Sequence, residues 1–244
     1  MQSTSSLSEM QAVILAGGLG ERLGDLAQGQ PKSMVDINGA PFLKYQLALL
    51  RERGITDVVL CVGHLANAVR GYFRDGSDFG VRIKYSVEPG CLLGTAGAVK
   101  QAEPLLEPVF FLTYGDAYLR MDYAAALREL CRRGTLGLMV LFRNENRYGR
   151  SNVVVEDGLV GTYDKEHEAP GMDYINFGVS VLRREALALV PPGVPYSQED
   201  WYEALIRERE LAAFETKERF YEVGSPEGLA EFRSLVARGG SRDR

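Results

Sequence analysis

The apolar run Ala12-Val-Ile-Leu-Ala16 leads directly into the loop Leu15-Ala-Gly-Gly-Leu-Gly-Glu-Arg-Leu23. A short continuous apolar run is typical of a β-strand that is buried on both faces. The glycines of the loop lack Cβ atoms, so backbone N–H groups can approach an anion closely. Arg22 adds a planar guanidinium suited to phosphate, and Pro31-Lys32 follows closely enough to fold back over the same place. This junction predicts a phosphate-binding loop at the end of the first strand.

The spacing of the glycines excludes two common phosphate loops. The dinucleotide fingerprint GxGxxG would need glycine where Leu23 stands, which also argues against a nicotinamide-dependent dehydrogenase. The GK[ST] ending of the nucleoside-triphosphatase P-loop is missing at the required offset. The loop therefore predicts a different class of phosphate site.

The first half of the chain alternates between predicted strands and predicted helices. The expected strands after the first are 57–62, 82–87 and 108–113, and the expected helices are 42–53, 67–73, 96–102 and 123–133. Such alternation predicts an α/β fold with a mostly parallel central sheet and right-handed crossovers.

The second half has a different rhythm, with few helices between its strands. The expected strands are 136–142, 151–156, 159–164 and 173–182, and Glu156-Asp-Gly158 is a hairpin turn signal. Short helices are expected at 197–209 and 226–236. This pattern predicts an antiparallel extension of the parallel sheet. We expect a disordered leader at 1–10, a single domain over 11–237 and a flexible tail at 238–244.

Composition limits the classes of function. The 244 residues are 45% hydrophobic and 25% charged, with a formal net charge of −5, which is ordinary for a globular protein. The negative charge disfavours broad binding to nucleic acid, although a few local cations could still bind a small anion. Apolar runs are too short for a membrane span, and the polar start is unlike a secretion signal, so a cytoplasmic protein is expected. Cys61, Cys91 and Cys131 have no metal-binding or disulfide spacing.

Five segments together resemble the motifs of sugar-1-phosphate nucleotidyltransferases, in the order of that family. The first is the loop at 15–23 with Pro31-Lys32. The others are Leu93-Gly-Thr-Ala-Gly-Ala98, Tyr114-Gly-Asp116, Asp164-Lys165 and Tyr221-Glu-Val-Gly-Ser-Pro226. The match extends from about residue 11 to 232, and it looks closest to short bacterial heptose-1-phosphate guanylyltransferases and N-acetylmuramate-1-phosphate uridylyltransferases.

The resemblance implies a Rossmann-like three-layer fold whose antiparallel extension binds the sugar. It implies that a nucleoside triphosphate and a sugar-1-phosphate react to give a nucleotide sugar and pyrophosphate, with Mg²⁺ as cofactor. Arg22, Lys32, Asp116 and Lys165 would be catalytic, and Asp116 and Glu222 would bind the metal. The implied nucleotide-binding residues are Leu15, Ala16, Gly17, Gly18, Gly20, Glu88, Gly94 and Thr95. The implied sugar-binding residues are Gly115, Tyr148, Gly149, Asn152, Asn176 and Gly178.

The chain departs from the family pattern at two acids. Glu222 replaces the usual Asp, which leaves open whether it coordinates metal directly or through water. Glu21 stands where a small hydroxyl residue is usual. These departures leave a second interpretation open, in which the chain is a catalytically silent relative that binds a nucleotide sugar and regulates a partner. A homo-oligomer is also possible.

The sequence says more about the base than about the sugar. Glu88 precedes the predicted base loop, and a carboxylate can accept two parallel hydrogen bonds from the N1–H and amino groups of guanine. GTP is therefore favoured, with UTP and CTP as alternatives. The Asn side chains in the sugar-binding set both donate and accept hydrogen bonds, which suits hydroxyl groups, but they do not identify the sugar.

Overall fold

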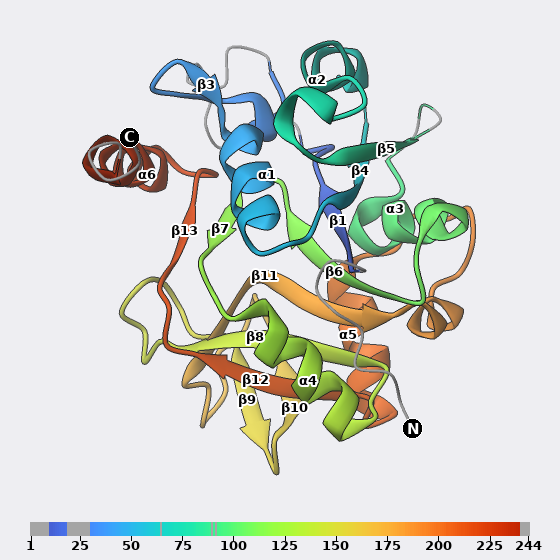
Figure 1. The fold of residues 1–244 in the computed structure, drawn as a ribbon. Helices are drawn as coiled ribbons and strands as arrows, with labels where there is room; N and C mark the ends of the chain where they lie inside the picture. Colours follow the sequence, from blue (N-terminus) through green and yellow to red (C-terminus); the bar gives the residue numbers. More distant parts are fainter. Residues whose placement is uncertain (1–9, 19–29, 64, 89, 91, 240–244) are drawn as a thin grey trace.

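The computed structural model describes residues 10–18, 30–63, 65–88, 90 and 92–239. Within these residues a nine-stranded sheet has the order β5-β4-β1-β6-β11-β8-β12-β10-β9 (Figure 1). Its first four strands are mutually parallel. They are β1 (Gln11–Leu15), β4 (Asp57–Val62), β5 (Arg82–Val87) and β6 (Val109–Tyr114). The predicted parallel sheet of the first half is therefore confirmed, and β4 and β5 have the predicted bounds.

The second half continues the same sheet with mixed strand directions. Its strands are β8 (Gly137–Arg143), β9 (Val153–Glu156), β10 (Leu159–Tyr163), β11 (Tyr174–Arg183) and β12 (Leu211–Thr216). β11 is antiparallel to both β6 and β8, as the sequence predicts. β12 is parallel to β8 and was not predicted as a strand, so a purely antiparallel extension is wrong. β9 pairs with β10 and also with β11, so that β11, β8, β12, β10 and β9 close on one another.

Helices cover both faces of the sheet because successive strand residues point to opposite sides. Ala12 and Ile14 of β1 pack with α1 (Phe42–Glu52) and α2 (Ala66–Phe73), in a core that also includes α4 (Tyr123–Arg133). Val13 between them packs on the other face with α3 (Gly94–Ala102) and α5 (Gln198–Arg207). Each of these helices begins and ends within a few residues of its predicted bounds.

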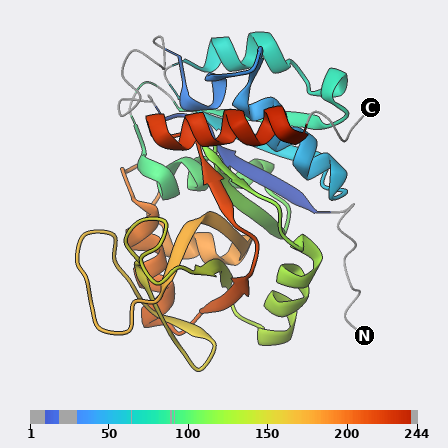
Figure 2. The same cartoon turned by 90° about the vertical axis from the view of Figure 1, so that its left-hand side faces the viewer.

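Two short sheets and the last helix join the end of the chain to its beginning. The short sheets are β2 (Asp36–Ile37) with β3 (Ala40–Pro41), and β7 (Ala117–Leu119) with β13 (Phe220–Glu222). The 3-10 helices of the described residues are Lys32–Met34, Ser77–Phe79, Glu103–Leu105 and Arg184–Leu189. The last helix, α6 (Pro226–Gly239), crosses in front of the β1–β6 part of the sheet in Figure 2.

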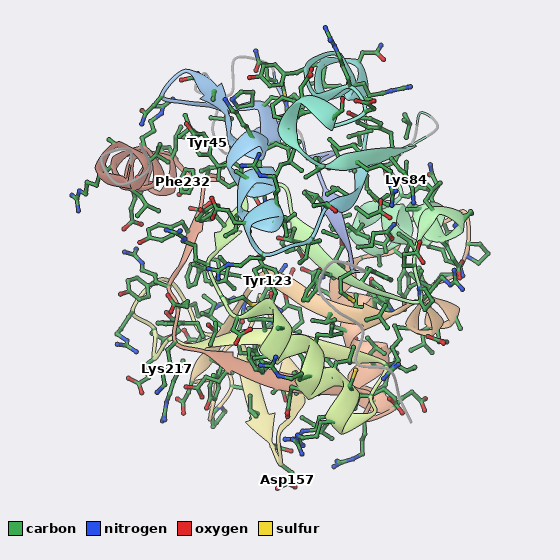
Figure 3. The ribbon with its side chains drawn as sticks, in the orientation of Figure 1. Tyr45, Lys84, Tyr123, Asp157, Lys217 and Phe232 are labelled. Carbon is green, nitrogen blue, oxygen red and sulfur yellow. The ribbon has the colours of Figure 1, made fainter. Side chains whose placement is uncertain are left out.

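Aromatic packing fixes α6 against α1. The ring of Phe232 lies 5.0 Å from that of Phe42 and 5.9 Å from that of Tyr45, with edge-to-face geometry. Figure 3 labels Tyr45 and Phe232 where the two helices meet. Arg233 of α6 also donates to the carbonyl oxygen of Asp36. Residues after β13 are thereby attached to the first fifty residues of the chain.

The described ends of the chain correct two predictions. Met10, assigned to the leader, is 3% exposed and belongs to the core, while residues 1–9 lie outside the described part. α6 continues through Arg238 to Gly239, so these two residues are not part of a tail. Among the helices that the structure describes, none has the length and apolar character needed to cross a membrane. Cys61 is buried and Cys131 exposed, both as free thiols, and Cys91 lies outside the described residues.

Candidate active site

A cavity of about 580 Å³ lies at the carboxyl ends of β1, β4, β5 and β6. Ligands of open α/β sheets bind at this edge. The cavity brings together the predicted nucleotide-binding residues that the structure describes, which are Leu15, Ala16, Gly17, Gly18, Glu88, Gly94 and Thr95. Lys32, Asp116 and Lys165 line it as well. Gly20, Glu21 and Arg22 lie outside the described residues.

The ends of β1 and β6 approach each other closely at Gly115. Its N–H donates to the carbonyl oxygen of Leu15 over 2.9 Å. A Cβ atom on Gly115 would lie 2.8 Å from that same oxygen, so a larger residue would push the two strand ends apart. Gly115 lines the first cavity, not the sugar side predicted for it. Cys61 lies on the floor of this cavity, and burial together with the Glu88 charge raises the pKa of its thiol to about 12.

Glu88 is held in place by the loop that follows it. Its Oε1 accepts a hydrogen bond of 2.8 Å from the backbone N–H of Leu93. Its Oε2 lies close to the backbone of Gly17 and Gly63, where added Cβ atoms would come within 3.3 Å and 3.0 Å of it. Glu88 therefore connects the phosphate loop to the predicted base loop while it lines the cavity.

The base loop itself is attached to the segment that precedes α5. The carbonyl oxygen of Tyr196 accepts from the N–H groups of Ala96 and Gly97, each over 3.1 Å. A Cβ atom on Gly94, whose φ is +71°, would lie 2.6 Å from that oxygen. The hydroxyl of Thr95 accepts from the N–H of Gln198 over 2.7 Å. The structure thus gives Gly94 and Thr95 a supporting role that sequence alone did not indicate.

Lys32 and Asp116 form an ion pair at the centre of the site. The Nζ of Lys32 lies 3.1 Å from Oδ2 of Asp116, and each side chain is only about one-fifth exposed (19% and 20%). Lys32 is the first residue of a 3-10 helix, and the backbone N–H of Lys32 donates to the carbonyl oxygen of Gly18. The predicted fold-back of Pro31-Lys32 over the phosphate loop is therefore confirmed in its geometry.

A second cavity, of about 610 Å³, adjoins the first one. Tyr114, Asp116 and Lys165 line both cavities. Of the predicted sugar-binding residues, Tyr148, Asn176 and Gly178 line the second cavity. The side-chain nitrogen of Asn176 is buried and has no hydrogen-bond partner among the described residues, while its oxygen accepts from the N–H of Gly178. Asn176 therefore has an unpaired hydrogen-bond donor just behind the lining of the second cavity.

Two predicted sugar-binding residues line neither cavity. Asn152 is buried, and its side-chain oxygen accepts from the backbone N–H of Asn176 over 3.0 Å. The carbonyl oxygen of Gly149 accepts from the side-chain amide of Asn144 over 2.7 Å. The structure therefore places Asn152 behind Asn176, and Gly149 in the turn that precedes Asn152. Neither residue lines a cavity.

Lys165 stands between the two cavities, above two aromatic rings. Its Nζ is 5.6 Å from the ring centre of Tyr114 and 5.7 Å from that of Tyr163. Its ammonium donates to Glu199, which lines the first cavity and was not predicted as a site residue. Burial alone would lower the pKa of Lys165, but Tyr114 and Glu199 outweigh burial and the pKa is raised. Lys165 is therefore an ammonium ion near neutral pH.

The two predicted metal-binding acids lie side by side, Asp116 in the turn before β7 and Glu222 at the end of its partner strand β13. Glu222 pairs with Ala117 in the β7–β13 ladder, and the N–H of Val223 donates to the carbonyl oxygen of Asp116 over 2.9 Å. Both carboxyl groups line the second cavity. The carboxylate of Glu222 accepts hydrogen bonds from the N–H of Gly224 and the hydroxyl of Ser225, which immediately precede α6.

These donors fit a divalent cation that shares its coordination with a ligand. Mg²⁺ prefers oxygen ligands and is usually held by one or two carboxylates plus substrate phosphates. No group of three or more potential metal ligands is found among the described residues, so protein side chains there do not form a complete cage. Asp116 and Glu222 are suited to a metal that arrives with phosphate.

Sequence reasoning missed four charged residues that line the cavities, which are Glu199, Arg219, Glu227 and Glu231. Glu199 comes from the first turn of α5, and Arg219 lines the second cavity over the rings of Tyr148 and Tyr221, paired with Glu231. None of the four stands in a motif that the sequence analysis used. The capping pattern Ser197-Gln-Glu-Asp200 is a signal that could have located the helix start that brings Glu199 to the cavity.

Comparison with known proteins gives the family. The family model described as "Nucleotidyl transferase" matches residues 11–237. A D-glycero-alpha-D-manno-heptose 1-phosphate guanylyltransferase of Campylobacter jejuni is 29% identical over 224 residues, covering 91% of this chain and 98% of the relative. An N-acetylmuramate alpha-1-phosphate uridylyltransferase of Neisseria meningitidis is 39% identical over 121 residues, covering 49% of this chain and 52% of the relative.

A solved structure extends the likeness to the fold. HddC from Yersinia pseudotuberculosis, crystallised in complex with GMP-PN, superposes with a TM-score of 0.77 at 27% identity, covering 93% of this chain and 99% of that one. The mixed α/β nucleotidyltransferase fold is therefore confirmed. Nucleotidyltransferases of this family typically use a divalent metal. The chain belongs to the nucleotidyl transferase family, as an enzyme of the sugar-1-phosphate nucleotidyltransferase type.

Proposed function

We propose that this enzyme transfers GMP from GTP to a heptose-1-phosphate, giving a GDP-sugar and pyrophosphate. The proposal is supported most directly by the two cavities that meet at Asp116 and Lys165. The nucleotide would occupy the first cavity and the sugar-phosphate the second, so that the reacting phosphorus lies at their junction. The relative from Campylobacter jejuni, which is named for this reaction, matches over nearly its whole length.

The chemistry requires positioning and charge neutralisation more than covalent catalysis. A phosphate oxygen of the sugar-1-phosphate attacks the α-phosphorus of GTP, and the bond to the β-phosphate breaks as pyrophosphate leaves. The attacking oxygen already carries charge near neutral pH, so a general base is not required. In the proposal Lys165 and Lys32 hold the two phosphates in line for this displacement.

The metal site of the proposal consists of Asp116 and Glu222. A divalent cation, Mg²⁺ in the proposal, would neutralise triphosphate charge when bound there. The ammonium of Lys32 contacts Asp116 and in the proposal also binds a phosphate oxygen of the nucleotide. Arg22, which lies outside the described residues, remains our proposed ligand of the departing pyrophosphate.

Recognition of guanine is assigned to Glu88. The backbone N–H of Leu93 occupies one lone pair of Glu88 Oε1. Each oxygen of the Glu88 carboxylate can still accept further hydrogen bonds. Guanine offers two parallel donors to such a carboxylate, whereas uracil presents a single N–H between two carbonyl oxygens. Support also comes from the solved relative that holds GMP-PN. The uridylyltransferase from Neisseria meningitidis makes UTP the second candidate.

Recognition of the sugar is assigned to Asn176, with Tyr148 and Gly178 beside it. The unpaired side-chain nitrogen of Asn176 can donate to a sugar hydroxyl. Rings such as Tyr148 and Phe177 in the same lining offer apolar surface to the C–H face of a sugar. We retain Asn152 as a positioning residue for Asn176 and assign no sugar contact to Gly149.

The test is a matrix of five nucleoside triphosphates against several sugar-1-phosphates, read by pyrophosphate release. We expect kcat/KM for GTP to exceed that for UTP by about 10- to 100-fold, the range that mismatched polar groups give in a pocket. Glu88→Gln should reduce this preference, because its amide would face the guanine donors. The control is Glu107→Gln, an exposed acid just before the opposite end of β6. A pyrimidine preference would refute the guanine assignment.

A further inference from the structure

Among the described residues, Glu199 is the acid that forms an ion pair with the ammonium of Lys165. Lys165 follows β10, and its flexible four-carbon side chain has many alternative rotamers. Its side chain is 40% exposed, and that of its partner Glu199 is 41% exposed. The aromatic rings of Tyr114 and Tyr163 lie near the ammonium, and the hydroxyl of Tyr114 is a neutral hydrogen-bond partner for it. Glu199 is the charged partner, and the ion pair directs the ammonium toward the start of α5.

The position of Glu199 is in turn set by the base loop. Glu199 is the second residue of α5, whose start is fixed by a capping box between Ser197 and Asp200. The segment 196–198 forms four hydrogen bonds with the loop 93–97. They are Tyr196 N–H to Leu93 O (2.8 Å), Ala96 N–H and Gly97 N–H to Tyr196 O (3.1 Å each), and Gln198 N–H to the Thr95 hydroxyl (2.7 Å).

The anchoring extends into the core on the far side of the helix. The hydroxyl of Tyr202, one turn after Gln198, is buried and lies 2.6 Å from the hydroxyl of Ser180 on β11. The side chain of Gln198 also donates to Tyr202. The first turn of α5 is therefore a rigid support shared by the base loop and the central sheet, and Glu199 projects from it into the first cavity.

We propose that Glu199 is a positioning residue that aims Lys165 at the phosphates and couples its placement to the base loop. A nucleotide that binds to the base loop, residues 93–97, stabilises the start of α5. The start of α5 in turn fixes the position of the Glu199 carboxylate. Lys165 is thereby oriented before the sugar-phosphate enters the second cavity. This inference rests on the proposed function for its kinetic part, whereas the contact itself can be tested without turnover.

Charge favours this role over that of an ordinary surface ion pair. The groups that face the ammonium are Glu199 and Tyr202 from α5, Tyr114 from β6 and Tyr163 from β10, with Asp116 in the same cavities. Arg150 contacts only the backbone oxygen of Lys165. Glu199 is thus the carboxylate that contacts the ammonium, and its negative charge helps to raise the pKa of Lys165.

The experiment compares Glu199→Gln with Glu203→Gln in the full chain. Glu203 is exposed on the same helix, one turn further on, and serves as the matched control. The first readout is the labelling rate of Lys165 by an amine-reactive reagent at pH 8, measured by peptide mass spectrometry. Because only the neutral amine reacts, loss of the Glu199 charge should raise labelling by about threefold or more. Folding is checked by thermal unfolding of both variants.

The second readout is steady-state kinetics with the substrate pair that turns over best. In Glu199→Gln we expect kcat to fall by about tenfold, because a misplaced catalytic group weakens the transition state. KM for the nucleoside triphosphate should change by less than about threefold, since Glu199→Gln removes no phosphate-binding cation. The alkaline limb of the pH profile should move to lower pH. Glu199→Asp, which keeps the charge on a shorter side chain, should restore part of kcat.

The link to the base loop has its own variant. Thr95→Val removes the hydroxyl that accepts from Gln198 and keeps the shape of the side chain. It should raise the labelling of Lys165 in the same direction as Glu199→Gln, by a smaller factor.

Several results would overturn the inference. Unchanged labelling in a folded Glu199→Gln variant would mean that the contact is absent in solution. Increased labelling with unchanged kcat would mean that the contact has no role in positioning. Unchanged labelling in Thr95→Val would remove the coupling to the base loop. A different preferred nucleotide or sugar would refute the proposed function and leave the labelling results valid.

Discussion

The two cavities of this enzyme are similar in volume and are built by different means. The first depends on close backbone approach, where Gly17 and Gly115 let strand ends come close together. The second is formed by side chains on the mixed part of the sheet, such as Tyr148, Asn176 and Arg219. Phosphates are alike in every nucleotide, and a backbone loop suits them. Sugars differ in their hydroxyls, and exchangeable side chains suit that variety.

The largest expected effect is at Asp116, because this residue belongs to both cavities. Asp116→Asn should lower kcat by about 100-fold or more, since the carboxylate both pairs with Lys32 and faces the proposed metal. Pyrophosphate release with saturating substrates measures the change. Asp78→Asn, on an exposed 3-10 helix, is the control. Near-normal turnover in a folded Asp116→Asn variant would refute the assignment of this residue.

The next effect tests the backbone character of the first cavity. Gly115→Ala would place a Cβ atom 2.8 Å from the carbonyl oxygen of Leu15, so the strand ends must separate. We expect a loss of about 1–3 kcal/mol in the free energy of unfolding, together with a marked fall in turnover. Urea titration measures the stability.

The matched control for Gly115→Ala is Gly71→Ala in α2. A Cβ atom there has no neighbour within 4 Å, and alanine favours helix by up to about 1 kcal/mol. Gly71→Ala should therefore stabilise the chain slightly. If Gly115→Ala were equally harmless, close backbone approach would not define the first cavity.

A smaller effect tests the side-chain character of the second cavity. Asn176→Asp keeps the acceptor for the N–H of Gly178 and replaces the unpaired donor by an acceptor. KM for the sugar-1-phosphate should rise by about tenfold, the value of one lost hydrogen bond, while KM for the nucleotide changes little. Initial-rate kinetics with each substrate varied in turn separate the two constants. Asn38→Asp, at the β2–β3 turn, is the control, and an equal rise in both KM values would contradict the division of the cavities.

The smallest effect lies outside both cavities. Hydrogen bonds from Arg132 and Arg133 outweigh burial and lower the pKa of Glu129 to about 2, against 4.5 ordinarily. A carboxyl group with a lowered pKa stabilises the fold above about pH 4.5 and loses that contribution as the pH falls toward 2. Glu129→Gln should reduce the free energy of unfolding at pH 7 by less than about 1 kcal/mol, because the pair is near the surface. The difference from wild type should disappear near pH 2 in denaturant titrations, and a constant difference would contradict it.

The sequence predicted the first cavity better than the second for a physical reason. Strand–loop–helix units are local, so the buried strand at 12–16 and the glycines after it predict where phosphate binds. The strand β12 escaped prediction because Leu211–Thr216 contains two alanines and a glutamate, residues that are depleted in strands. Its pairing with β8, some seventy residues earlier in the chain, leaves no signal in the local pattern.

The same reason explains the missed and displaced site residues. Glu199 reaches Lys165 only because the base loop, α5 and the end of β10 come together in the fold. Asn152 resembles a sugar ligand by residue type, but the pairing of β9 and β11 places it behind Asn176. Both outcomes depend on tertiary contacts between segments that are far apart in sequence.

The central claim is that the two cavities hold the two halves of one product, with Asp116 and Lys165 at its diphosphate. A crystal structure of the enzyme with a divalent cation and the nucleotide sugar made by its best substrate pair tests this most directly. We expect the base of the bound nucleotide sugar to lie beside Glu88 and Thr95, its sugar beside Asn176, and its diphosphate between Lys165 and Asp116. A product bound with its sugar in the first cavity, or outside both cavities, would contradict it.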